Sequence, residues 1–420
     1  MFTIEKEPMT TFHELLAPVM PIVQQIEHDR PKHHNEDLTW SAFIQILVYF
    51  FTKNLLSGNE LIVSLQSADA ELGLPKTSRR ALSEGFWRFS PKLLRDTLTT
   101  YLTTYAYPEI PELSFIGPAY AIDGSLFPLI QAIYWPKTRD VVKNVKLHLK
   151  FSLTSAIAVD FVLGGEHSSE RAAFRAMIQP GQTYVLDRGY MEYHLVQDVD
   201  ARDAWLVVRA YNNIEVETIE ELPVVVPDAM NGHWTNIRDR IVRPKDPEFA
   251  HISFRLVECT VGTTTYRLIT NLYQLTTFQI ILLYAYRWQI ELIFRYLKHT
   301  MHGVHIITQN PIGIQNFFYA LLLTSLLHLH FKQRCLAEEG HDPPSSLPIP
   351  PQQPDERNVQ TSDDGVRPTN HLAIARFFAR LNDALTRFWK ISKHWLHTLA
   401  DCLSRPYTSD IVHLLNKYAV

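Results

Sequence analysis

The sequence predicts an α/β fold in which a mixed β-sheet lies between helical regions at the two ends of the chain. Apolar residues recur with helical spacing over residues 1–115, strand-like patterns replace them from residue 116, and helical spacing returns in 371–420. The chain has 420 residues, of which 46% are hydrophobic and 20% are charged. Such a chain can bury a large core, and its length is typical of two or three domains.

The region 1–115 contains two expected buried helices. Residues 38–51 are almost continuously apolar and follow Asp37 and Thr39, either of which can cap a helix. Residues 59–65 form a second, shorter segment of the same kind. We therefore expect a compact helical unit before the sheet begins.

A basic helix is expected next. Thr77 or Ser78 can cap it, and Arg79 and Arg80 would then lie in its first turn. A helix N-terminus with two arginines can bind phosphate or read a DNA groove. An ordinary solvated basic face explains the same pattern equally well.

Residues 116–211 have the pattern of five strands and two helices. The expected strands are 120–123, 145–153, 156–165, 182–187 and 204–211, and the helices are 168–178 and 193–199. Three strands, a helix, a strand, a helix and a strand are the order of a ribonuclease-H-like core. In such a core the ends of the first and fourth strands lie side by side, and Asp123 and Asp187 stand at those two ends.

The second half of the chain divides into four expected parts. These are a mostly β insertion at 212–276, the second part of the core at 277–335, a Pro-rich linker at 336–370, and a helical region at 371–420 that could serve dimerisation. Within the insertion the expected strands are 224–226, 251–261 and 263–270.

A helix over 284–298 carries four polar residues, Tyr284, Arg287, Glu291 and Lys298. On a regular helix they fall within an arc of roughly 60°. Arg287 and Glu291 could be an ordinary exposed pair four residues apart. The alternative is a metal-bound carboxylate beside two cations that hold phosphates.

Asp123, Asp187 and Glu291 together suit phosphodiester cleavage. Each Asp alone is more typical of a turn or a helix cap. Three convergent carboxylates, however, can hold two divalent cations, and Mg²⁺ prefers such oxygen ligands. Asp123 would bridge the two ions. Arg287 and Lys298 would hold the cleaved strand by its phosphates.

Charge and cysteine content limit the alternatives. The formal net charge of −4 is not typical of a nucleic-acid-binding protein, but Lys and Arg gather in 76–96 and 137–150. Within the second segment Lys146 belongs either to a phosphate-binding stripe or to a solvated sheet face. The three cysteines show no paired spacing, which argues against disulfides and a zinc site and suits a reducing cytosol.

No membrane or secretion segment is expected. The apolar runs 43–51 and 317–327 are shorter than a membrane span, and the first residues lack a signal pattern. We expect a cytoplasmic protein that is associated with the nucleoid when it is bound to DNA. His33 and His34 lack partners at ligand spacing, so a solvated loop is preferred to a metal site.

Three motifs give the chain a resemblance to a known family. They are Asp123-Gly-Ser, Val185-Leu-Asp187-Arg-Gly-Tyr190, and Tyr284-x2-Arg287-x3-Glu291-x6-Lys298. Together they resemble the DDE transposases of bacterial insertion sequences. The group is that of insertion sequence four, which includes the transposon-five transposase. The resemblance covers roughly residues 38–335.

The resemblance implies a reaction and its residues. Asp123, Asp187 and Glu291 would be the catalytic triad, binding Mg²⁺ or Mn²⁺. Tyr284, Arg287 and Lys298 would contact the end of the mobile element. The enzyme would cleave element ends and join their 3′ hydroxyls to target DNA, as a homodimer in a synaptic complex.

Members of the family hold a flipped base with an aromatic residue from the insertion, and Trp234 is a candidate, although core packing is the preferred role for it. Two other readings remain open. One is a catalytically inactive DNA-end-binding regulator or a domesticated transposase. The other is a different nuclease on the same core, which the Tyr-Arg-Glu-Lys spacing disfavours.

Overall fold

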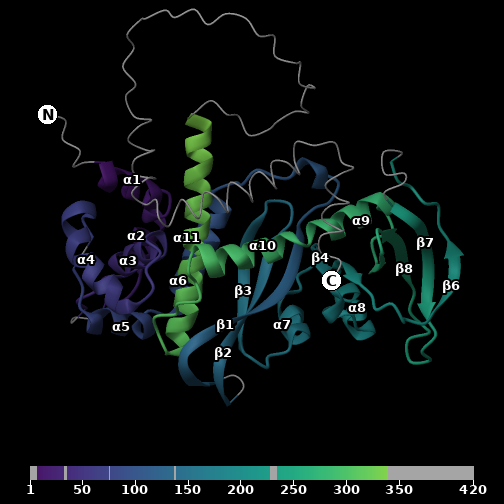
Figure 1. The fold of residues 1–420 in the computed structure, drawn as a ribbon, viewed down its shortest axis with the longest axis horizontal. Helices are drawn as coiled ribbons and strands as arrows, with labels where there is room; N and C mark the ends of the chain where they lie inside the picture. The colour runs from purple at the N-terminus through teal and green to yellow at the C-terminus, as the bar shows by residue number, and fades with distance from the viewer. Residues whose placement is uncertain (1–6, 33–35, 75, 137–138, 228–233, 339–420) are drawn as a thin grey trace, which may run out of the picture.

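In this computed structural model a nine-stranded mixed sheet runs through the molecule, in the order β3-β2-β1-β4-β5-β9-β8-β7-β6 (Figure 1). The structure describes residues 7–32, 36–74, 76–136, 139–227 and 234–338. The expected C-terminal helical region, nearly all of the expected linker, and His33 and His34 lie outside the described residues.

Five strands and two helices follow one another as expected between residues 119 and 209. The strands are β1 (Ala119–Trp135), β2 (Asp140–Ser152), β3 (Ile157–Gly165), β4 (Thr183–Leu186) and β5 (Trp205–Arg209). The helices are α7 (Glu170–Met177) and α8 (Tyr193–Asp200), and a 3₁₀ turn, η3 (Arg188–Tyr190), follows β4. β1, β2 and β3 pair antiparallel, whereas β1, β4 and β5 run parallel.

Two expectations about the first strands are wrong. β1 does not end at Asp123 but continues to Trp135, with an irregular register between Pro128 and Ile133. Apolar and mostly polar residues alternate over 145–153, which indicates a half-buried strand, but in β2 His148 and Lys150 are buried as well as the apolar residues. The face that carries them is covered by α7 and its flanking loops, a contact that the local pattern cannot reveal.

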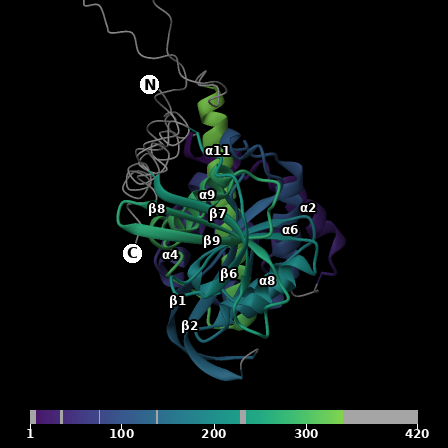
Figure 2. The same cartoon turned by 90° about the vertical axis from the view of Figure 1, so that its right-hand side faces the viewer.

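The insertion continues the sheet of the core. It consists of β6 (Val216–Glu221), β7 (Trp234–Pro244), β8 (Phe254–Val261) and β9 (Thr264–Thr270), and β9 pairs antiparallel with β5. Figure 2 shows this end of the sheet from the side. Residues 224–226 are not a strand, and β6 and β7 were not expected. β6 is an exposed edge strand rich in Glu, which hides its β-pattern.

Helices gather at the opposite end of the molecule (Figure 1). They are α1 (Glu7–Leu16), α2 (Met20–Asp29), α3 (Trp40–Thr52), α4 (Gly58–Leu72), α5 (Arg79–Arg88) and α6 (Pro91–Thr104), followed by a 3₁₀ turn, η2 (Pro111–Leu113). The expected caps are confirmed: Thr39 accepts a hydrogen bond from the Ala42 amide, and Ser78 accepts one from the Ala81 amide.

The long helix α11 (Pro311–Glu338) connects this helical end to the sheet, packing against α3, α5, α6 and β3. It runs three residues into the expected linker. Its segment Pro311–Phe331 is long and apolar enough to span a membrane, but 78% of the most apolar window is buried inside the fold. These contacts explain its composition as that of a core helix.

The expected single helix over 284–298 is broken. α9 (Thr277–Tyr286) ends where α10 (Gln289–Arg295) begins, and a π-helical turn, η5 (Tyr296–Thr300), follows. Across the break the chain tightens: the Arg287 amide donates to the Tyr284 carbonyl at 3.1 Å. The residues at the break are ordinary helix formers, so the helical pattern ran through it without interruption.

Candidate active site

Asp123 and Asp187 lie next to each other on neighbouring parallel strands. Ala121 of β1 is in register with Val185 of β4. Two residues further along each strand the chain reaches Asp123 and Asp187, on the same face of the sheet. The structure therefore brings the two expected carboxylates together, although only Asp187 follows the end of its strand.

The break between α9 and α10 carries the remaining polar groups to these carboxylates. The Tyr284 hydroxyl donates to Asp187 Oδ1 at 3.2 Å. Arg287 Nη2 donates to Glu291 Oε1 at 2.8 Å. α9 packs against β4 and β5, and α10 packs against β1, so both helices lie over the strands that carry the Asp residues.

Arg287 is a buried cation between carboxylates. Its side chain is 11% exposed, whereas that of Glu291 is 42% exposed. Burial opposes its charge, yet the pKa of Arg287 is raised because the Tyr284 oxygen and the carboxylates of Asp187 and Glu291 lie around it. Its Nε has no hydrogen-bond partner among the described residues. Arg287 and Glu291 do form an ion pair, but because Arg287 is buried it is not the ordinary exposed helix pair that the sequence also allowed.

Asp123 carries a charge that the folded protein disfavours. Burial raises its pKa to about 6, and the nearby carboxylates of Glu170 and Glu291 act in the same direction. The Gly124 amide, which donates to Asp123 Oδ1 at 2.7 Å, and Arg287 only partly offset this. A cation beside Asp123 would relieve the repulsion.

Glu170 is a further carboxylate of this site that sequence reasoning missed. It is the first residue of α7, and its Oε1 lies 2.7 Å from Lys146 Nζ. A Cβ built on Gly124 would lie 3.2 Å from Glu170 Oε1, so the glycine leaves room for this carboxylate beside Asp123. A Glu in the first turn of a helix is common at any N-terminus, which is why the pattern gave no signal.

Lys146 and Lys298 are placed differently with respect to the site. Lys146 pairs with Glu170, and its side chain is 18% exposed. Lys298 lies in the π turn η5 with its Nζ 5.0 Å from the centre of the Phe127 ring, and burial lowers its pKa. Phe127 follows Asp123 by four residues on β1. Lys298 therefore packs on β1 at a point beyond Asp123.

Trp234 is not available to a DNA base. It is 3% exposed and stacks on Phe278, with ring centroids 5.8 Å apart. The structure supports core packing for this ring and corrects its assignment as a DNA contact. Arg79 and Arg80 are exposed in the first turn of α5, where Arg80 Nε pairs with Glu84 at 2.8 Å.

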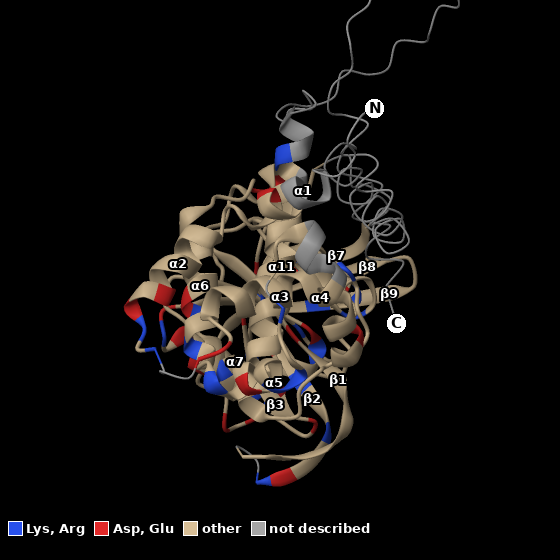
Figure 3. Cartoon of the chain, turned by 90° about the vertical axis from the view of Figure 1, so that its left-hand side faces the viewer, with Lys and Arg blue, Asp and Glu red and all other residues tan. Residues whose placement is uncertain are grey.

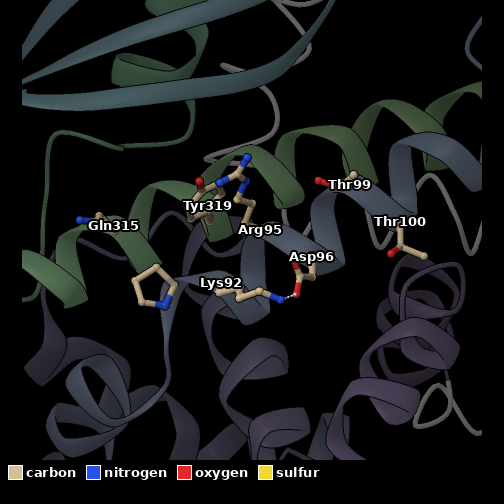
Figure 4. Close-up of a pocket in the computed structure, with 8 residues that line it drawn as sticks. Lys92, Arg95, Asp96, Thr99, Thr100, Gln315 and Tyr319 are labelled. Atoms are coloured by element: carbon tan, nitrogen blue, oxygen red, sulfur yellow. Dashed lines mark hydrogen bonds and ion pairs between the residues drawn. The ribbon is translucent and has the colours of Figure 1, made fainter. Parts of the chain in front are cut away.

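A pocket of about 610 Å³ lies elsewhere, between α6 and α11 (Figure 4). Its lining residues include Lys92, Arg95, Asp96 and Tyr319, and none of the carboxylates described above. Lys92 and Asp96 pair with each other at 2.7 Å across its wall. We assign no role to this pocket.

The donor atoms of the carboxylate site fit a hard divalent cation. Carboxylate oxygens are the ligands that Mg²⁺ and Mn²⁺ prefer. A cation bound here would stabilise the charged form of Asp123, which burial disfavours. Across the described residues, however, no three His, Cys, Asp or Glu side chains are already gathered as a metal-binding group. Glu291 is turned toward Arg287, and its exposed side chain would have to rotate to join Asp123.

Comparisons with known proteins point in one direction. A family model described as a transposase DDE domain matches residues 116–327, half of the chain. A protein of Sinorhizobium fredii (strain NBRC 101917 / NGR234) with the name "Putative transposase y4zB" is 25% identical over 213 residues. The matched part is 50% of this chain and 59% of that relative, so the chain spans about three fifths of the relative's length.

Proposed function

This chain belongs to the transposase DDE domain family, and from that premise we propose that it is a metal-dependent transposase. It binds the ends of its own insertion sequence, cleaves them by phosphodiester hydrolysis and joins the 3′ hydroxyl ends to target DNA. The observation that carries the proposal is that Asp123 and Asp187 lie side by side, with the Tyr284 hydroxyl bonded to Asp187 and the Arg287–Glu291 pair close enough to act on the charge of Asp123. The spacing of Tyr284, Arg287, Glu291 and Lys298 supports membership of the insertion-sequence-four group.

The strand arrangement supports a ribonuclease-H-like core. Three antiparallel strands, β3, β2 and β1, are followed by two parallel ones, β4 and β5, with α7 and α8 as the crossovers. That order places the two Asp residues on adjacent strands, as the function needs. The insertion separates this part from α10, which brings the third carboxylate.

Asp123, Asp187 and Glu291 are the proposed ligands of Mg²⁺ or Mn²⁺. Such ions, when bound, activate the attacking oxygen and neutralise charge on the leaving oxygen. Two hydrogen bonds position these ligands. The Tyr284 hydroxyl orients Asp187, and Arg287 holds Glu291 close to the sheet in the metal-free protein. Arg287 and Lys298 then contact the phosphates of the cleaved strand.

DNA binding outside the catalytic site is assigned to residues 1–115, with Arg79 and Arg80 as phosphate contacts. Figure 3 shows basic and acidic segments next to each other around α5, α6 and α7. Because Arg80 and Lys146 are already paired with Glu84 and Glu170, their contribution depends on exchanging these partners for phosphate. We further propose that the protein acts as a homodimer that holds two element ends together. It would be cytoplasmic and, when bound to DNA, associated with the nucleoid.

Cleavage of DNA carrying the element's end sequence, in Mg²⁺, tests the function. We expect the wild-type protein to cut at the element boundary and Glu291→Gln to lose at least about a thousandfold in rate, because a ligand of the metal is gone. Glu221→Gln, which removes an exposed carboxylate paired with Arg238 in the insertion, is the matched control and should cut normally. A wild-type protein that binds the ends without nicking or joining them would refute the enzyme.

That negative result would favour the alternative, a catalytically inactive DNA-end-binding regulator or domesticated transposase. One observation speaks for it: Glu291 is paired with Arg287 instead of standing with the two Asp residues. If Glu291→Gln cuts as fast as the wild type, the enzyme stands but the assignment of the third carboxylate falls.

A further inference from the structure

Tyr190 lies in the turn that follows Asp187 and packs against the helix that begins with Glu170. It ends the η3 turn, where its amide donates to the Asp187 carbonyl at 3.0 Å. Its ring packs edge-on against Phe174 of α7, with centroids 6.1 Å apart. Phe174 follows Glu170 by four residues and so lies on the same side of α7. Only 1% of Tyr190 is exposed.

The hydroxyl of this buried tyrosine has no hydrogen-bond partner among the described residues. Buried hydroxyls are costly to leave unpaired, and most tyrosines avoid it. Tyr184, two positions before β4 ends, is equally buried, but its hydroxyl bonds the Gln179 amide, the Met177 carbonyl and Gln182 Oε1 at 2.8–2.9 Å. The same residue type is therefore satisfied at one position and unsatisfied at the other.

The carboxylates of Asp123, Glu170 and Asp187 lie close enough to act on the unpaired hydroxyl, but none of them hydrogen-bonds it. Burial raises the pKa of Tyr190, and the charges of Asp123, Glu170 and Asp187 raise it further. The hydroxyl therefore keeps its proton at neutral pH. A neutral hydroxyl can both donate and accept a hydrogen bond, and here it lies within the influence of the carboxylates proposed to hold a cation.

Building on the proposed function, we propose that Tyr190 is a residue of the active site whose hydroxyl hydrogen-bonds an oxygen atom held at the carboxylates. That oxygen belongs either to a water on the cation or to a phosphate of the DNA. Both offer the partner that the protein itself does not supply. Fixing such an oxygen orients it for the reaction, which is the role of polar groups around a metal site.

A purely structural role predicts something different. The ring already packs against Phe174, and a phenylalanine would keep that contact. If packing were the whole role, removing the hydroxyl would change no property of the metal or the DNA. An unpaired oxygen would simply be lost, and the protein would be as stable as before or more so.

The test compares Tyr190→Phe with Tyr184→Phe, its matched control. In metal-free buffer we expect Tyr190→Phe to unfold at the wild-type midpoint or above it, and Tyr184→Phe below it, because only Tyr184 loses hydrogen bonds. End cleavage by Tyr190→Phe should fall about tenfold to a hundredfold, whereas Tyr184→Phe should cut normally at temperatures where it is folded.

The source of the oxygen is resolved by adding Mn²⁺ without DNA. A smaller Mn²⁺-induced rise of the unfolding midpoint in Tyr190→Phe than in the wild type indicates a cation-bound water. An equal rise combined with slower cleavage indicates a phosphate oxygen. Both outcomes support the proposal.

Three results overturn it. One is wild-type cleavage by Tyr190→Phe together with a wild-type Mn²⁺ shift. The second is a loss of metal-free stability like that of Tyr184→Phe, which would reveal a hidden structural bond. The third is a wild-type protein that neither cuts DNA nor responds to Mn²⁺, which removes the proposed function as well. A wild type that cuts while both Tyr190 readouts stay unchanged overturns the role of Tyr190 alone.

Discussion

Two buried arginine–carboxylate clusters lie on the same sheet, one in the insertion and one at the candidate active site. In the insertion Arg255 donates to both oxygens of Asp239, at 2.8 and 2.6 Å, and further to the Leu272 and Leu275 carbonyls. Thr277 donates to Asp239 Oδ2 at 2.7 Å. At the active site Arg287 is left with an unpartnered Nε within the described structure.

The difference separates a structural cluster from a functional one. Arg255 and Asp239 fill each other's hydrogen-bonding capacity and tie β7, β8 and the start of α9 together. The cluster at the active site leaves hydroxyl, guanidinium and carboxylate groups incompletely bonded. Unmet hydrogen bonds are costly in the free protein but available to a ligand.

The largest effect on stability is expected at the satisfied cluster. Asp239→Asn leaves the buried guanidinium of Arg255 without its counter-charge, which should lower the free energy of unfolding by about 3–5 kcal/mol. Denaturant unfolding in metal-free buffer measures this. An unchanged midpoint would mean that the Asp239 cluster stabilises the fold no more than the active-site cluster does, which would contradict the comparison.

An Asp→Asn substitution at the active-site cluster, Asp123→Asn, should act in the opposite direction. The pKa of Asp123 is raised to about 6 in the folded protein, so the folded state binds more protons than the unfolded state between pH 4 and 6. Stability due to this group is therefore greatest at low pH and is lost as the pH rises through about 6. Asp123→Asn removes the penalty and should gain about 2–3 kcal/mol at neutral pH.

Unfolding of both variants between pH 4 and 8 without metal checks this sign. The gain from Asp123→Asn should vanish toward pH 4. A loss of stability at neutral pH would show instead that Asp123 is stabilised by Arg287 in the free protein.

A smaller effect is expected at Trp234. Because the ring stacks on Phe278 in the core, Trp234→Phe should cost about 1 kcal/mol through lost volume and leave binding of the element ends unchanged. End-binding titrations beside unfolding curves measure both. Weaker binding with full stability would restore the DNA contact that burial argues against.

The smallest effect on stability is expected at Arg80, whose exposed pair with Glu84 contributes little. Arg80→Ala should leave the unfolding midpoint unchanged while weakening end binding and its dependence on salt. Binding measured at two salt concentrations tests it, with Arg238→Ala, another exposed paired arginine, as the control. Equal binding by both variants would remove α5 from the DNA interface.

Local signals predicted much of this architecture. The helix caps at Thr39 and Ser78 and the order of strands from β1 to β5 follow from side-chain chemistry and apolar periodicity over short stretches. The adjacency of Asp123 and Asp187 then followed from the strand order alone.

Contacts distant in sequence account for what was missed. β6 became a strand only because β7 pairs with it at the sheet edge. Lys150 stands at a polar position of the alternating strand 145–153, yet its Nζ donates to Gln182 Oε1 and lies over the Tyr120 ring. Glu170 joined the site through the crossover of α7. The residues next to these positions in the sequence carry no pattern from which such contacts could be predicted.

The pairing of β5 with β9 has a consequence for synthesis of the chain on the ribosome. β5 ends at residue 209, but its outer edge is covered only when residues 264–270 have emerged. During that interval the apolar strand Trp205–Arg209 is an open edge, the kind of surface at which chains pair wrongly. The insertion therefore closes the core during translation, and a nascent chain truncated before β9 should aggregate through that edge.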